Sequence, residues 1–298
     1  MRHPINPLVD YAFKRLLGAE PNKNLTRHFL NAILRPQQPI QDVTLVNPFN
    51  DRDFAEDKLS VVDVKARDAL GRTFHIEVQV LLHRGLRPRM LYTWADLYQA
   101  QLVKGHDYKT LEPVTSIWLL DEVMLSESPA VHHRFTAFDR DHRVTLCDHL
   151  SLHVIELPKL RREALPLDDE QRWCTFLSEA RYWTALPDAL NTPELRQAMS
   201  TLIEISDQER EYYNYASRLD QLRVKATIEA SARQAQEQLE AAKAQLKDTE
   251  SRLDVAESKL DVAESKLDAT ESRLQRARQA LLDAGLDPDA LLDDTPDR

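Results

Sequence analysis

One stretch of the chain combines residue types that could bind a metal ion and act on a phosphate. Residues 60–80 consist of two runs in which apolar and polar residues alternate, joined by a turn that contains Gly71. Alternation of this kind is typical of paired β-strands with one face toward a core. Asp63 lies on the polar side of the first run, whereas Glu77 and Gln79 lie on the polar side of the second. One face of the predicted hairpin therefore carries two carboxylates and an amide.

The turn determines which of these side chains face each other. A three-residue loop, 69–71, with its glycine in the left-handed conformation is a common hairpin connection. With this loop, Asp63 lies opposite Glu77. Lys65 then lies opposite His75. Directly opposed side chains have Cβ atoms about 4.5–5.5 Å apart, and like charges in this position are destabilising.

Two opposed carboxylates need solvent, a shared proton or a cation between them. A hard divalent ion with oxygen ligands would satisfy the pair, and it could activate a water and stabilise charge on a phosphate. Lys65 and Gln79 flank the pair, where they could hold that water or contact the substrate. We expect Asp63 on a solvent-exposed strand face. A merely solvated sheet face is the alternative interpretation of the same spacing.

The rest of the sequence predicts the elements that hold this hairpin in place. Helices are predicted by apolar residues at helical spacing, and strands by alternating or continuous apolar runs. The predicted helices lie within 5–35 with an interruption at 18–22, from Pro88 to a stop at Gly105, and in two or more segments within 168–206. The predicted strands lie at 42–49, in the hairpin, at 114–125 and twice within 131–157. Helices alternating with a few strands indicate an α/β core.

The last third of the chain differs in kind from the core. Leucine recurs every seven residues from Leu239 to Leu281, and three residues after each leucine comes an alanine or threonine. No glycine or proline interrupts 207–284, so a single long helix is possible. A heptad seam predicts a homo-oligomer through a coiled coil, here residues 239–281. A solitary charged helix is the alternative interpretation.

Composition sets the broad class of the protein. The chain has 298 residues, of which 42% are hydrophobic, and no apolar run approaches the roughly 18 residues of a membrane span. Cys147 and Cys174 show no metal-type spacing and are expected to be packed as small apolar groups. The sequence therefore predicts a cytoplasmic protein without a membrane segment.

The charge is unevenly distributed along the chain. The net charge is −10, and residues 229–298 with 17 acidic and 10 basic residues contribute −7 of it. Residues 58–89 carry seven basic and three acidic residues, a local +4 around the hairpin. A basic patch of this kind permits a polyanionic partner. Only five glycines are present, and no glycine-rich phosphate loop is found among them.

Four segments together match a known pattern in order and spacing. They are DYAFKRLLG (10–18), LTRHFLNAIL (25–34), DVKARDALGRTFHIEVQV (63–80) and RMLYTWADLYQAQLVKGHDYKTLEPV (89–114). They resemble the Rpn family of recombination-promoting nucleases, also called putative transposases, in the PD-(D/E)XK superfamily. The resemblance covers about residues 4–220. It implies a restriction-endonuclease-like α/β core and metal-dependent cleavage of DNA.

The resemblance assigns roles to individual residues. Asp63 matches the metal-binding Asp, and Glu77 matches the acid of the (D/E)-x-K element. Asp10 matches the acidic position of the first helix, as a further metal ligand or water contact. Gln79 stands where the superfamily usually has Lys; an amide can orient a water but cannot supply a positive charge. Lys65 could restore that charge, with Lys58 as the alternative.

These inferences combine into one expected organisation. We expect a nuclease-like core at 1–160, a helical extension at 161–206, a long coiled-coil helix at 207–284 and a C-terminal stub at 285–298.

The expected activity is that of an Mg²⁺-type DNA endonuclease. The residues expected to contact DNA phosphates are Arg84, Arg87 and Arg89, with Lys14 or Arg15 near the first helix. Phosphate contacts would position the duplex without specifying its sequence. The alternatives are a nuclease-like module that binds DNA or a partner without cutting, and a structural protein whose coiled coil is the working part.

Overall fold

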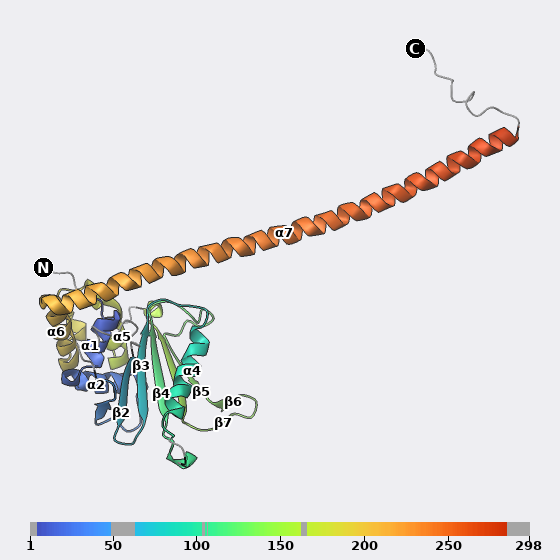
Figure 1. The fold of residues 1–298 in the computed structure, drawn as a ribbon. Helices are drawn as coiled ribbons and strands as arrows, with labels where there is room; N and C mark the ends of the chain where they lie inside the picture. The colour runs from blue at the N-terminus through green and yellow to red at the C-terminus, as the bar shows by residue number, and fades with distance from the viewer. Residues whose placement is uncertain (1–4, 49–62, 103–104, 106, 162–165, 285–298) are drawn as a thin grey trace. The chain divides into compact units, whose positions relative to one another are not determined.

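The chain divides into two compact units, residues 1–226 and 227–298. The computed structural model describes residues 5–48, 63–102, 105, 107–161 and 166–284 (Figure 1). Lys58 and the predicted stub at 285–298 lie outside the described residues. Within the described residues, none of the helices is long and apolar enough to cross a membrane.

A six-stranded mixed sheet forms the centre of the first unit. Its strands lie in the order β1-β2-β3-β4-β8-β5. Their bounds are Val43–Leu45 for β1, Asp63–Asp68 for β2, Thr73–Gln79 for β3, Val114–Leu120 for β4, His132–Thr136 for β5 and Leu150–Glu156 for β8. The β3-β4 and β4-β8 pairs are parallel and the other pairs are antiparallel. A separate two-stranded ribbon consists of β6 (Phe138–Asp139) and β7 (Val144–Thr145).

Helices cover both faces of this sheet, as expected for an α/β core. Their bounds are Asp10–Leu17 for α1, Lys23–Leu34 for α2, Leu86–Gln99 for α4, Asp169–Glu179 for α5 and Pro193–Asp207 for α6. Short 3₁₀ turns lie at Glu20–Asn22, Tyr108–Thr110, Leu157–Lys159, Ala180–Tyr182 and Asp188–Leu190. The long helix α7 (Glu209–Asp283) begins in the first unit and continues through the second. The long uninterrupted C-terminal helix is confirmed, although Asp207 belongs to α6 and α7 begins at Glu209. A coiled coil requires a second helix.

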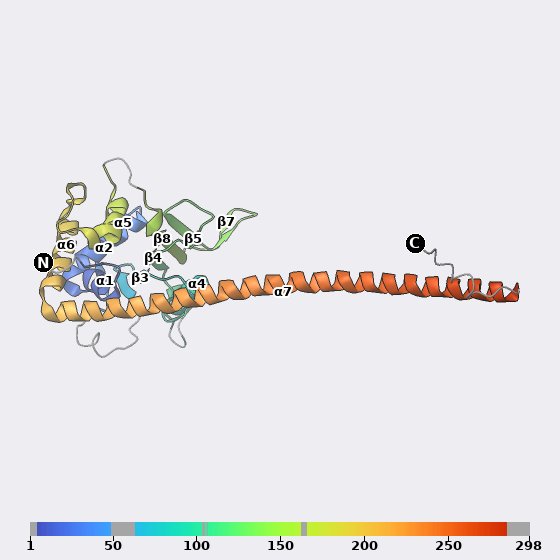
Figure 2. The same ribbon diagram turned by 90° about the horizontal axis from the view of Figure 1, so that it is seen from above.

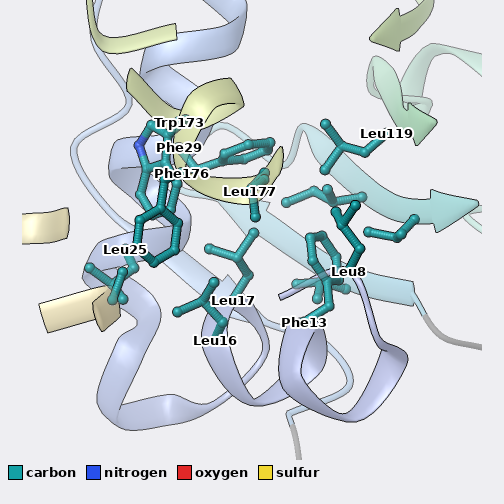
Figure 3. Packing of buried hydrophobic residues seen from close by; sticks show 14 of the residues in the cluster. Leu8, Phe13, Leu16, Leu17, Leu25, Phe29, Leu119, Trp173, Phe176 and Leu177 are labelled. Atoms are coloured by element: carbon teal, nitrogen blue, oxygen red, sulfur yellow. The ribbon is translucent and has the colours of Figure 1, made fainter. Parts of the chain in front are cut away.

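The two faces of the sheet have different cores. On one face α1, α2, α5 and α6 pack against alternate strand residues such as Val64 and Ile76, in a cluster that includes the fully buried Phe29 and Trp173 (Figures 2 and 3). On the other face α4 packs against Trp118 and neighbouring apolar residues in a smaller cluster. Because side chains alternate along a strand, Asp63 and Glu77 belong to the α4 face.

The hairpin has the register that the sequence predicts. Asp63 pairs with Glu77, and Lys65 pairs with His75. Gly71 takes a positive φ of 80°, the left-handed conformation expected of the last residue in the three-residue loop. The local turn therefore sets which polar side chains meet on the α4 face.

Two boundary predictions and one burial prediction are wrong. Helix α4 ends at Gln99 rather than at Gly105 and begins before Pro88, which the first helical turn tolerates because its N–H would be unpaired there. Strand β4 ends at Leu120, earlier than the apolar run suggests. Cys174 is buried as expected, but Cys147 is exposed because it lies in the connection between β7 and β8.

Replacing Gly71 tests the importance of the turn. Gly71→Ala should lower the free energy of unfolding by about 1–2 kcal/mol, because an L side chain disfavours the left-handed conformation. Gly71→Asn should lose less, because asparagine tolerates positive φ better. Either new Cβ would lie 3.1 Å from Cγ of Glu112, so the difference between the variants isolates the backbone effect. Urea unfolding measures it, and equal losses would assign the cost to the Glu112 contact instead.

Candidate active site

Strands β2 and β3 bring two carboxylates together beneath the surface of the α4 face. Asp63 and Glu77 are directly paired across the hairpin, and each is only 3% exposed. The expectation of a solvent-exposed position for Asp63 is therefore wrong. It fails because the side chains of Asn47, Lys65 and His75 surround the carboxylate. Buried carboxylates need charged or hydrogen-bonding partners to stay ionised.

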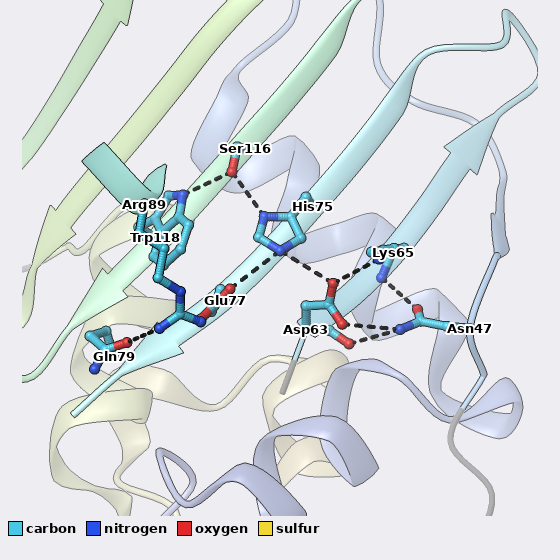
Figure 4. Close-up of polar contacts among 9 residues, drawn as sticks. All are labelled: Asn47, Asp63, Lys65, His75, Glu77, Gln79, Arg89, Ser116 and Trp118. Carbon is cyan, nitrogen blue, oxygen red and sulfur yellow. Dashed lines mark hydrogen bonds and ion pairs between the residues drawn. The ribbon is translucent and has the colours of Figure 1, made fainter. Parts of the chain in front are cut away.

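His75 supplies the first of these partners. It lies on the same side of β3 as Glu77, and its Nε2 is 3.4 Å from Asp63 Oδ2 and 3.5 Å from Glu77 Oε2 (Figure 4). Burial lowers the pKa of His75, but the two carboxylates beside it outweigh burial and raise it. An imidazolium between opposed carboxylates compensates the repulsion that their pairing would otherwise cause.

Asp63 shows the reciprocal effect. Burial raises the pKa of its carboxyl, but the neighbouring His75 and Lys65 outweigh burial and lower that pKa. Lys65 Nζ is 3.1 Å from Asp63 Oδ2, and its side chain is one-third exposed. Asp63 is therefore held ionised by one buried and one accessible cation.

Arg89 is the cation that pairs with Glu77. Its NH2 donates to Glu77 Oε1 at 2.5 Å, and its NH1 donates to Gln79 Oε1 at 3.3 Å. The guanidinium carbon also lies 5.6 Å from the ring centroid of Trp118, a cation–π distance. Arg89 was expected to contact DNA phosphates. In the structure its guanidinium is engaged with Glu77 and Gln79, although 41% of the side chain remains accessible.

Neutral side chains fix the orientation of the charged ones. Asn47 donates through Nδ2 to the backbone oxygen and Oδ1 of Asp63, and its Oδ1 accepts from the backbone N–H of Lys65. On the other side, the Ser116 hydroxyl accepts from the indole N–H of Trp118 and lies 2.8 Å from His75 Nδ1. An imidazolium at His75 donates this Nδ1–H to Ser116, which leaves Nε2 facing the carboxylates (Figure 4).

Asp10 occupies a different environment from the pair. Its helix, α1, packs in the cluster on the opposite face of the sheet. The Asp10 carboxylate accepts from the backbone N–H of Tyr11 and lies 3.8 Å from Arg218 Nε. Burial raises the pKa of this carboxyl. Its role as a third metal ligand stays a prediction, since no group of three His, Cys, Asp or Glu in the described part of the chain is arranged to hold a metal ion.

The residues predicted to contact DNA fall into two groups. Arg84 is exposed just before α4, and Arg87 is exposed in its first turn, 3.7 Å from Glu127. These two approach from the face that carries the carboxylates. Lys14 and Arg15 lie on α1 at the other face, where Arg15 is 3.7 Å from a carboxylate of the α7 segment in the first unit.

Comparison with protein families finds one match. A family model described as PD-(D/E)XK nuclease family transposase matches residues 7–232. This range covers the whole sheet, both clusters and the first part of α7. The chain belongs to this PD-(D/E)XK family. The resemblance noted in the sequence is thereby confirmed, while no curated protein and no solved structure matches the chain.

PD-(D/E)XK nucleases generally use divalent metal ions, so the donor atoms of the pair need to fit such an ion. Carboxylate oxygens are the ligands that hard cations prefer. Glu77 Oε2 is buried without a hydrogen-bond partner, as is His75 Nε2, because their mutual contact is long. Asp63 and Glu77 could therefore hold a divalent ion, with water and phosphate oxygens completing its ligands.

Sequence reasoning missed three parts of this PD-(D/E)XK site. The sequence places His75 opposite Lys65 on the side of Glu77, but its role as the cation between the two carboxylates was not predicted. Asn47 and Ser116 come from neighbouring strands or loops, and nothing in their local sequence distinguishes them. Only the sheet order, with β4 beside β3, brings Ser116 to His75.

The pH dependence of stability tests the charge of His75. A raised pKa in the folded state stabilises the protein fully below the unfolded value of 6.5, and this stabilisation is lost as pH rises through the folded pKa. His75→Gln should therefore cost about 1–3 kcal/mol at pH 6 and less at pH 9. Unfolding free energies of both proteins at the two pH values measure the difference. An equal difference at both would show that His75 is neutral in the fold.

Proposed function

We propose that the chain is a metal-dependent DNA endonuclease that takes part in recombination or transposition. The proposal is carried by the opposed carboxylates of Asp63 and Glu77, with Gln79 two residues on, in a chain of a nuclease family. This pair is the part of the site whose chemistry matches phosphodiester hydrolysis. The same residues would have little reason to be buried together in a purely structural sheet, because burying like charges is costly.

Each side chain would have a distinct task in cleavage. Asp63 and Glu77 would hold the divalent ion, with Mg²⁺ as the natural candidate, which when bound supplies an activated water and charge stabilisation at the phosphate. Lys65 touches Asp63 and still reaches solvent, so its ammonium can meet a phosphate oxygen beside the pair. Gln79 would orient the substrate and would not supply a positive charge, since its amide is neutral and bonded to Arg89.

Phosphate contacts would hold the duplex over the site. Arg84 and Arg87 are exposed at the start of α4, the same helix that sends Arg89 to Glu77. Contacts of this kind fix position without reading sequence, and they weaken as salt increases. We therefore assign DNA positioning to the N-terminal end of α4 rather than to α1.

A non-cutting DNA-binding module is the second candidate function. It is favoured because the negative charges of Asp63 and Glu77 are already balanced by side chains of the protein itself, namely His75, Lys65 and Arg89. Nicking of supercoiled plasmid with and without Mg²⁺ separates the two functions. Retention of DNA without nicking under both conditions would favour the module.

Asp63→Asn is the direct test of cleavage. The amide keeps the size of the side chain but removes a negatively charged ligand, so plasmid nicking in Mg²⁺ should fall by at least about 10²-fold. Asp139→Asn, on the exposed β6-β7 ribbon, is the matched control and should cut like wild type. Thermal unfolding of both variants checks that the fold is retained. Unchanged nicking by a folded Asp63→Asn protein would exclude the assigned mechanism.

Lys65→Gln tests which residue supplies the positive charge at the phosphate. Loss of one preorganised cation should lower the rate of nicking by about 10²-fold. Gln79→Ala should lower it less, because an amide only orients the water or phosphate. Single-turnover nicking rates at saturating enzyme compare the two variants. A larger loss with Gln79→Ala would assign the decisive contact to the amide instead.

A further inference from the structure

The C-terminal part of α7 carries an apolar stripe that nothing in the described chain covers. Its leucines recur every seven residues and are 53–67% exposed from Leu239 to Leu274. The helix runs without interruption to Asp283. An exposed leucine stripe of this length is costly in water and is typical of a helix that associates with another helix.

The spacing of the stripe assigns the heptad positions. Alanine or threonine follows each leucine by three residues, which makes leucine position a and the small residue position d. With the leucines at d instead, the a positions would be mostly charged, for example Glu257 and Glu264. The seam is therefore a leucine layer alternating with a small-residue layer.

Charges flank this seam in a regular order. Four consecutive e positions are acidic, namely Glu250, Glu257, Glu264 and Glu271, with the basic Lys243 before them and Arg278 after them. The four g positions that accompany them are all basic, namely Arg252, Lys259, Lys266 and Arg273. Positions e and g are those that face a partner helix across the seam.

Six of these eight charged residues have no residue of opposite charge three or four positions away in the same helix; the exceptions are Glu250, near Lys247, and Arg252, near Asp248. Asp254 lies four residues after Glu250 and three before Glu257, so acids adjoin acids along the helix surface. The same arrangement repeats in the next two heptads. Lys259 has only valine and alanine three and four residues away on either side. Like charges at these spacings destabilise a helix, and a second helix that placed opposite charges beside them would offset this cost.

The relative direction of two such helices decides whether the charges attract. In a parallel pair each g residue faces the e residue five positions further along the other chain. Arg252 then meets Glu257, Lys259 meets Glu264 and Lys266 meets Glu271, each contact occurring twice. In an antiparallel pair e faces e and g faces g, which sets acid against acid and base against base. The attraction ends at Arg278, which a parallel pair places opposite Arg273.

We propose that residues 239–281 form a parallel coiled coil with the same segment of a second copy of this chain. The two helices are in register, so that equivalent leucines pack against each other. The occupant of the stripe is a second copy because the e and g charges of one chain complement those of an identical chain. Parallel direction follows from the sign of the charges. The register in which equivalent leucines meet follows because it gives the greatest overlap between the leucine stripes of the two helices.

Parallel pairing has a consequence for the first unit. Each chain enters the coil from its first unit through residues 227–238, so both copies join it at the same end. A homodimer would then present two nuclease units together. The proposal goes beyond nuclease function and does not depend on it, because association requires neither DNA nor metal.

Sedimentation of the full chain tests the pairing. Wild type should sediment at twice 34.4 kDa in the micromolar range. Changing Glu257, Glu264 and Glu271 to Lys should weaken the dimer by more than about tenfold, because each attraction becomes a repulsion. Adding Arg252→Glu, Lys259→Glu and Lys266→Glu should restore it, since this six-residue variant keeps the net charge and reverses every pair.

The first variant also contains its own control for helix formation. Its new lysines lie beside aspartates of the same helix, so helicity should be retained in circular dichroism while the dimer is lost. A wild type that remains at 34.4 kDa overturns the proposal. Equal dimerisation of wild type and the triple lysine variant overturns it as well.

Cross-linking tests direction and register. Cys147 is exposed, so Cys147→Ser provides the background. Thr249→Cys and Thr270→Cys are then added in separate proteins, both at d positions of the seam. In a parallel dimer with leucines in step, each cysteine meets its own counterpart, and both proteins should form disulfide-linked dimers on oxidation. Only one of the two can do so in an antiparallel pair, so failure of either protein to cross-link overturns the proposed direction and register.

Discussion

The contact of His75 with Asp63 and Glu77 is the constraint on which the site depends. His75 lies within 3.5 Å of both carboxylates, all three groups are buried, and such groups are stable only when each charge is matched. The match requires the hairpin register, because a slip of one residue would turn one carboxylate to the opposite face. It also requires Arg89 from α4. Strand pairing and helix packing are therefore fixed by the same set of charges.

The hairpin could be predicted because its determinants are local. Alternation and a glycine-containing loop are enough to place Asp63 opposite Glu77, and the structure has that pairing. The partners of the pair could not be predicted in the same way. Arg89 reaches Glu77 only because α4 packs on this face, and Ser116 reaches His75 only because β4 lies beside β3. These contacts depend on sheet order, which no local pattern encodes.

The helices show the same division between local and tertiary information. The two N-terminal helices and the long C-terminal one are predicted well, because apolar periodicity and the absence of glycine and proline define them. The end of α4 was misplaced, because the helix ends at Gln99 and does not continue to Gly105. Asp10 is expected beside the carboxylates as a further ligand; in the structure it contacts the backbone N–H of Tyr11 and lies near Arg218, and its role at the metal stays a prediction.

The short loop of the hairpin also bears on how the chain folds. Asp63, Lys65, His75 and Glu77 are joined through a three-residue connection, so the entropy lost in bringing them together is small. Contacts between residues close in sequence form faster than contacts that close long loops. The charges that most need partners can thus neutralise one another while water still surrounds them, before the helices that depend on distant segments close over the sheet. We expect this order of folding to protect the chain from burying an unpaired carboxylate.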